Sequence, residues 1–121
     1  GREGPIVQVG SALGSSWGRF LKLSDEQVQI LVACGAAAGI SATFNAPIAG
    51  SLFAMEVILG RLTVRNFGAV VISAVSASVI SRSFWGNEAA FIVPVYSLNN
   101  FVELPIYIVL GIAAALVAVL F

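Results

Sequence analysis

The stretch Phe44-Asn45-Ala46-Pro47 divides an uncharged run of about 29 residues that extends from Gln27 to Met55. A single perpendicular membrane span needs about 20 apolar residues, so the run is too long for one span. Proline disfavours the α conformation in the residue before it, and the Asn45 side chain can bond its own backbone in a turn. The sequence therefore predicts a spanning helix over residues 25–44, a break, and a short helix over residues 47–59.

Composition places the chain in a lipid bilayer. Of 121 residues, 59% are hydrophobic and 10% are charged, whereas soluble domains carry about a quarter charged residues. The net charge is zero and no block of like charge occurs, so we expect no nucleic-acid partner. Histidine is absent and Cys34 is the single cysteine, so the usual metal, cofactor and His-based catalytic sites lack their residues. We expect a multi-pass integral membrane protein that has no metal or cofactor and is not an enzyme.

A full-length helix joined to a short one inside apolar sequence is typical of broken-helix transport proteins. Non-helical backbone at membrane depth must be shielded by protein or line a cavity. The run Gly35-Ala36-Ala37-Ala38-Gly39 adds a small-residue face that allows close helix packing. We therefore predict an all-α bundle of tilted and broken transmembrane helices. A tightly packed structural module without a transport role fits the same pattern, and that alternative stays open.

The chain opens with Gly1-Arg2-Glu3-Gly4-Pro5 in front of an uncharged helical run. Proline suits the first turn of a helix, so a helix is predicted over residues 5–20. The unpaired N–H groups and the positive end of the helix dipole form an anion site, which Gly4 lets an ion approach closely. Glu3 is an acid that can occupy or vacate this site, and is therefore a candidate gate. In the alternative interpretation, Arg2 and Glu3 are a solvated pair before an ordinary helix.

Short sequence patterns predict how the first helix packs and where the second helix begins. Gly10, Gly14 and Gly18 recur every four residues and leave one helix face almost bare for a neighbouring helix. Ser24 followed three residues later by Gln27 is a capping-box pattern, which predicts the start of the second helix.

Two further spanning helices are expected in the second half of the chain. Asn66 can cap a third spanning helix over residues 67–84. A proline within residues 89–102 disfavours a helix there and favours an extended external loop. A last helix is predicted over residues 105–121, with proline in its first turn.

Basic residues indicate which side of the membrane each junction faces. Arg19 and Lys22 follow the first helix, and Arg61 and Arg65 precede the third spanning helix. Lysine and arginine gather on the cytoplasmic side of membrane proteins. Both junctions are therefore expected in the cytoplasm.

Glu56 is the single charge in the short helix and lies near its C-terminal end. An ionisable residue in a membrane helix is costly, and its default interpretation is functional, here an inner-side charge. The alternative is an interfacial salt bridge to Arg61, five residues later.

Taken together, these motifs resemble the CLC family of chloride channels and chloride/proton exchangers. The resemblance covers nearly the whole chain and is carried by four segments in order: Gly1–Pro5, Gly35–Gly39, Phe44–Gly50 and Met55–Val57. It implies an all-helical fold with inverted-repeat halves and a homodimer with one pore per subunit. By this resemblance, residues 1–121 form part of a CLC-type transmembrane domain, and we expect the chain to be a piece of a larger protein.

The resemblance also implies roles for individual residues. Glu3 matches the gating glutamate that competes with chloride for the outer ion site, and the backbone of Arg2, Glu3 and Gly4 matches the lining of that site. Many proton-coupled members carry a second glutamate at the position of Val57, and valine cannot relay a proton. The short helix and the long helix after it belong to the subunit interface of the family. This implies dimer contacts from a set of apolar residues: Ile48, Leu52, Val71 and Ile72.

These observations lead to one preferred function and two alternatives. We expect a chloride-conducting pore gated by Glu3, which is channel-like because of Val57 and responds to voltage or pH. The first alternative is a chloride/proton exchanger of the same family. The second is the helical membrane module without transport.

Overall fold

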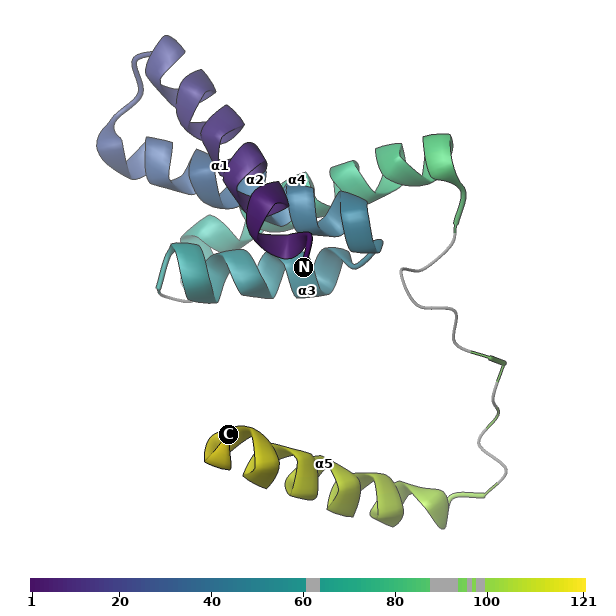
Figure 1. The fold of residues 1–121 in the computed structure, drawn as a ribbon. Coiled ribbons are helices and arrows are strands. Elements are labelled where there is room, and N and C mark those ends of the chain that lie inside the picture. The colour runs from purple at the N-terminus through teal and green to yellow at the C-terminus, as the bar shows by residue number, and fades with distance from the viewer. Residues whose placement is uncertain (61–63, 88–93, 96, 98–99) are drawn as a thin grey trace.

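A computed structural model describes residues 1–60, 64–87, 94–95, 97 and 100–121 of the chain. Every element among these residues is helical, which confirms the predicted all-α fold (Figure 1). In chain order they are α1 (Glu3–Phe20), α2 (Asp25–Phe44), α3 (Pro47–Phe53), the π-helical turn η1 (Ala54–Ile58), α4 (Val64–Trp85) and α5 (Glu103–Leu120).

Helices α1 and α2 run antiparallel and pack through small residues. A Cβ atom on Gly10 would overlap the carbonyl oxygen of Gly35, and a Cβ on Gly35 would overlap that of Gly10. One turn further along α1, a Cβ on Gly14 would overlap the carbonyl oxygen of Leu31. Backbones approach this closely only where side chains are missing, so the predicted packing face of α1 is confirmed.

Both ends of α2 are set by polar side chains. The Ser24 hydroxyl accepts the Gln27 backbone N–H at 3.4 Å, and the Gln27 side-chain oxygen accepts the Ser24 backbone N–H at 3.2 Å. The predicted capping box is therefore present. At the other end Asn45 adopts the left-handed conformation, with φ 54° and ψ 38°, and α3 begins at Pro47. Asparagine tolerates this conformation better than most residues, which explains the chain reversal.

The limits of α1 and α3 differ from the predicted ones. Helix α1 begins at Glu3 rather than Pro5, because proline is tolerated throughout the first turn, where its missing N–H is not needed. The α-helical part of α3 ends at Phe53 instead of continuing to residue 59. In η1 the N–H of Leu59 bonds to the carbonyl of Ala54, five residues earlier, at 3.1 Å.

The last two helices begin before their predicted starts; α4 also ends one residue beyond its predicted range of 67–84, whereas α5 ends one residue short of its predicted range of 105–121. Helix α4 spans Val64–Trp85, and Asn66, expected as its cap, is buried inside the first turn. Helix α5 spans Glu103–Leu120, with an acid in its first turn where the helix dipole favours negative charge.

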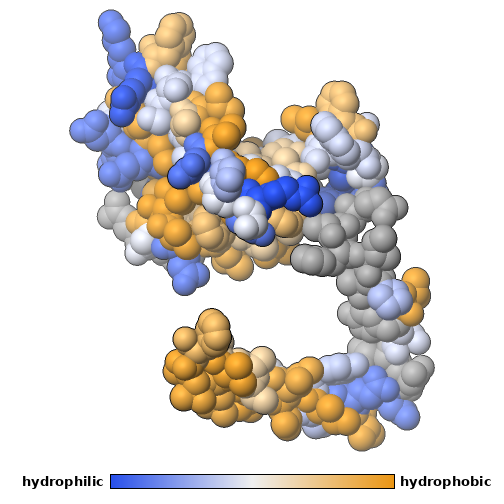
Figure 2. Space-filling model, in the orientation of Figure 1, coloured by the Kyte–Doolittle hydropathy of each residue, from blue (hydrophilic) through white to orange (hydrophobic). Residues whose placement is uncertain are grey.

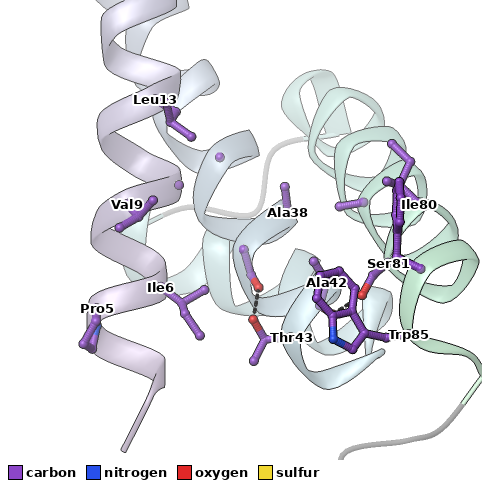
Figure 3. Close-up of a pocket in the computed structure, with 15 residues that line it drawn as sticks. Pro5, Ile6, Val9, Leu13, Ala38, Ala42, Thr43, Ile80, Ser81 and Trp85 are labelled. Carbon is purple, nitrogen blue, oxygen red and sulfur yellow. Dashed lines mark hydrogen bonds between the residues drawn. The ribbon is translucent and has the colours of Figure 1, made fainter.

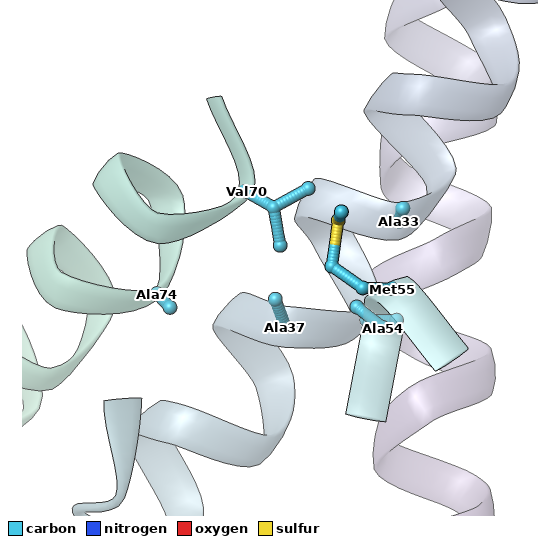
Figure 4. Packing of buried hydrophobic residues seen from close by; sticks show 7 residues of the cluster. Ala33, Ala37, Ala54, Met55, Val70 and Ala74 are labelled. Atoms are coloured by element: carbon cyan, nitrogen blue, oxygen red, sulfur yellow. The ribbon is translucent and has the colours of Figure 1, made fainter. Parts of the chain in front are cut away.

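The buried core is built mostly from alanine. Met55 and Val70 point toward the alanines of α2 (Figure 4). Two serines of α4 bond to the backbone of α2: Ser73 donates to the carbonyl of Cys34 at 3.0 Å and Ser81 to that of Ala42 at 2.7 Å. Small side chains bring α2 and α4 close enough for these hydroxyls to bridge them.

Among the residues that the structure describes, three helices are long and apolar enough to cross a membrane, at Asp25–Phe44, Asn66–Trp85 and Glu103–Leu120. Helix α5 contacts none of the other described helices, and hydrophobic side chains cover most of its visible surface (Figure 2). Most of the predicted external loop over residues 89–102 lies outside the described residues, as does Arg61.

Candidate functional site

The start of α1 presents backbone N–H groups without acceptors inside the helix. Arg2 is the N-cap and makes no side-chain cap bond, and the first helical bond runs from the Ile6 N–H to the Arg2 carbonyl at 3.2 Å. The amides of Glu3 and Gly4 precede this bond. The Glu3 side chain is 62% exposed, and its Oε2 lies 3.9 Å from the amino nitrogen of Gly1. The described chain therefore leaves this helix start open.

A polar cavity of about 460 Å³ lies beside the helix start. Arg2 lines it from the start of α1, the last turn of α2 supplies the opposite wall, and the end of α4 closes it. Glu3 is not among the lining residues. The cavity holds two guanidinium groups and no carboxylate among the described residues that line it: Arg2, Ala42, Thr43, Asn45, Ser81, Arg82, Trp85 and Gly86.

Asn45 ties the end of α2 to the end of α4. Its side-chain oxygen accepts the hydroxyl of the buried Ser78 at 2.8 Å and also accepts the Nε–H of Arg82. The left-handed backbone of Asn45 and this double acceptance hold one wall of the polar cavity. The side chain of Arg82 is thereby fixed at its Nε edge.

An apolar groove of about 610 Å³ runs between α1, α2 and α4 (Figure 3). Pro5, Val9 and Leu13 line it from α1, while Ile80 and Trp85 line it from α4. The groove and the polar cavity share four lining residues: Ala42, Thr43, Ser81 and Trp85. The two spaces therefore adjoin at the ends of α2 and α4.

Glu56 and Val57 lie in η1, away from the α1 start. Helix α3 runs antiparallel to α2, so the chain moves back along α2 as it passes from Gly50 to η1. Glu56 is exposed and Val57 is 60% exposed. The alternative partner of Glu56, Arg61, lies outside the described residues. The structure does not bring Glu56 together with Glu3.

Three of the four residues expected at a dimer interface surround one small groove. Ile48 and Leu52 of α3 and Val71 of α4 line a space of about 150 Å³ between the two helices. Ile48 is 77% exposed. Ile72 is 69% exposed but is not among the residues that line this groove.

Sequence reasoning missed the joint role of Asn45, Ser78 and Arg82. The sequence predicts a turn at Asn45 but no partner for Arg82. They are 37 residues apart in sequence, and their contact depends on how α2 packs on α4. The one available signal is a polar residue at the end of α2 and another in the last turn of α4.

A protein-family model described as a voltage-gated chloride channel matches residues 1–121. The chain belongs to the CLC family of voltage-gated chloride channels. CLC membership makes it an integral membrane protein, as its three apolar helices also indicate. No solved structure matches this CLC chain.

Relatives of this CLC chain carry both channel and exchanger names. A ClcB-like protein of Ralstonia nicotianae is 42% identical over 120 residues, which cover 96% of this chain and 28% of that protein. The H(+)/Cl(-) exchange transporter ClcA of Vibrio cholerae is 37% identical, over 100% of this chain and 26% of its own length. The chloride channel protein CLC-f of Arabidopsis thaliana is 35% identical, over 100% of this chain and 16% of its own length. The CLC chain thus spans between 16% and 28% of these relatives.

Proposed function

We propose that the whole protein conducts chloride across a membrane, that the start of α1 holds the anion, and that Glu3 gates it. The observation that carries this proposal is the place of the Arg2-Glu3-Gly4 segment. Glu3 and Gly4 are the first two residues of α1. Their amides and the Glu3 carboxyl group therefore share one helix start in a protein of a chloride-channel family.

A helix start suits a transported anion. Its partial positive charge attracts the ion without a full ionic bond, so the ion can also leave. Arg2 and Arg82 line the adjoining cavity and add positive potential along the approach. These groups favour the entry of an anion over a cation.

Glu3 competes with the ion for the same positive helix end. An ionised glutamate is favoured in the first turn of a helix, as an anion is. Protonation removes the negative charge from Glu3 and weakens its hold on this position. Loss of this negative charge should therefore favour conduction through the whole protein.

The test is anion flux through the full-length protein in liposomes, with Glu3→Gln as the variant. We expect flux to stay open and its pH dependence to be reduced, since glutamine cannot gain or lose a proton. Glu26→Gln is the matched control, because Glu26 is an exposed acid in the first turn of α2. Flux that disappears in Glu3→Gln, or that keeps its normal pH response, contradicts the gate.

Channel-like conduction is the preferred mode because Val57 occupies the position of a possible proton relay. An exchanger remains the second candidate, because the chain is 37% identical to a protein named as an exchange transporter. The discriminating measurement is whether a chloride gradient drives protons uphill into liposomes that contain the full-length protein. Uphill proton movement would overturn the preference for a channel. Glu56, an exposed acid in η1, is then the described group to test as an inner proton acceptor.

We also propose that the protein is a homodimer whose interface includes the groove between α3 and α4. Exposed Ile48, Leu52 and Ile72 are well suited to packing against a second apolar surface. A helical module without transport is the remaining alternative. It predicts that Glu3→Ala changes stability alone, with no effect on flux.

A further inference from the structure

The proposed conduction uses the arginines of the polar cavity as a source of positive potential, and the cavity itself carries a charge imbalance. Arg2 and Arg82 both line it, and no described lining residue is acidic. Neither arginine forms an ion pair with a carboxylate among the described residues. Two like charges facing one cavity repel each other, so an anion between them lowers the electrostatic energy.

The charged donors available to a ligand in this cavity come from the arginines. The Thr43 hydroxyl donates to the carbonyl of Gly39 at 2.9 Å, and the Ser81 hydroxyl donates to that of Ala42 at 2.7 Å. The Nε–H of Arg82 is taken by Asn45, which leaves the four N–H groups on its two terminal nitrogens. Asn45 therefore orients Arg82 and leaves a planar fork of donors available.

We propose that this cavity binds a phosphate group. Planar guanidinium forks match the oxygen atoms of phosphate in pairs, whereas a halide presents a single centre. A cavity of about 460 Å³ is also much larger than one halide ion needs. The proposed ligand is thus an oxyanion distinct from the chloride expected at the α1 start.

The surroundings indicate a membrane phospholipid as the first source of that phosphate. The apolar groove between α1, α2 and α4 adjoins the cavity and suits an acyl chain beside a bound headgroup. Trp85 lies at the junction of the two spaces, and tryptophan is enriched at the level of lipid headgroups. Free phosphate is the second possible source, because it offers the same oxygen atoms to the arginines and does not need the groove.

The experiment compares wild-type, Arg82→Gln and Arg19→Gln full-length protein in two arms. Arg19 is exposed at the opposite end of α1 and serves as the control. One arm titrates inorganic phosphate into detergent-solubilised protein at constant chloride and constant ionic strength, and follows the melting temperature. The other arm counts phospholipid molecules retained in native mass spectrometry after purification from vesicles of phosphatidylglycerol and phosphatidylcholine.

A lipid source predicts retained phospholipid in wild type and in Arg19→Gln, and its loss in Arg82→Gln. A free source predicts a saturable rise in melting temperature with phosphate, with affinity at least about tenfold weaker in Arg82→Gln. Either result supports the cavity as a phosphate site. The proposal is overturned if phosphate affinity and phospholipid retention are the same in all three proteins. It is also overturned if phosphate does not raise the melting temperature and no phospholipid is retained.

Arg82→Lys guards against misfolding of the glutamine variant. It keeps the charge, and Ser78 still donates to Asn45, but the planar fork is lost. Oxyanion binding should therefore weaken while the elution profile of the protein stays that of wild type. Both arms measure binding rather than flux, so their outcome does not depend on whether Glu3 gates chloride.

Discussion

Gly10 of α1 and Gly35 of α2 hold their two backbones in direct contact, and each lies where a Cβ on the other would be. This contact fixes the separation of α1 and α2 two turns after α1 begins at Glu3. The start of α1 and the polar cavity at the end of α2 are therefore set by the same helix pair. Disturbing this contact should affect both the stability of the pair and the position of Glu3.

Gly35→Val should destabilise the protein by about 1–3 kcal/mol or more, because the added side chain forces α1 away from α2. The measurement is thermal unfolding of the detergent-solubilised protein. Gly68→Val is the control, since a Cβ on Gly68 meets no atom within 4 Å. Equal losses in the two variants would show that the close contact is not a major source of stability.

Gly4→Ala should lower anion flux while leaving stability unchanged or slightly higher. A Cβ at Gly4 meets no atom within 4 Å, so alanine fits the folded chain. Helical Cβ atoms tilt toward the N-terminus of the helix, where the anion is proposed to rest. Flux in liposomes is compared with that of Gly111→Ala, which has equally open space. Unchanged flux in Gly4→Ala would argue against ion contact at this backbone.

Asn45→Ala should destabilise the protein more than Asn45→Gly. Both variants lose the oxygen that accepts bonds from Ser78 and Arg82, but glycine keeps the left-handed backbone without strain. A buried hydroxyl left without a partner costs about 1–3 kcal/mol, and Ser78 is buried. Thermal unfolding of Asn45→Gly, Ser78→Ala and the double variant measures how much the hydrogen bond between Ser78 and Asn45 contributes to stability. Simple additivity of the two single variants would mean that the bond contributes nothing.

Ser41→Ala should leave stability unchanged or raise it by up to about 1 kcal/mol. Ser41 is 0% exposed, and its hydroxyl has no hydrogen-bond partner in the part of the chain that the structure describes. Removing an unsatisfied polar group relieves a burial cost, and alanine fits the same space. Ser78→Ala is the matched comparison and should lose stability in the same unfolding experiment. A clear loss in Ser41→Ala would reveal a partner for this hydroxyl.

Ile48→Trp should weaken the proposed homodimer while leaving the subunit folded. Ile48 is 77% exposed, so the larger ring has room in the monomer but disturbs a surface packed against a partner. The measurement is the molar mass of the full-length protein in detergent by light scattering as it is diluted. Val79→Trp, also exposed and apolar on α4, is the control. An unchanged dimer in Ile48→Trp would place the interface elsewhere.

Local sequence signals predicted the local features of this fold. The all-α class follows from composition and the lengths of the apolar runs, and the capping box at Ser24 and Gln27 follows from residues three positions apart. The break between α2 and α3 follows from asparagine in front of a proline-initiated helix. Each of these features depends on neighbours in the chain, so no knowledge of packing is needed.

Features that depend on packing were not accessible in the same way. The bond between Arg82 and Asn45 requires α4 to lie along α2 at one particular offset. The π turn that begins at Ala54 has no glycine or proline to mark it, and Pro5 fits more than one position in a first turn. The roles of Glu3, Val57 and the exposed face at Ile48 stay predictions, because they concern ions, protons and a second subunit.

The π turn is a place where the chain can lose one residue with little loss of stability. Such a turn holds one residue more than an α-helical turn, so deletion of a single residue between Ala54 and Ile58 would convert it to ordinary helix. The same deletion in the middle of α2 would rotate every later side chain of that helix by about 100°, given 3.6 residues per turn. Single-residue length variation among relatives should therefore be tolerated in η1 and rejected in α2.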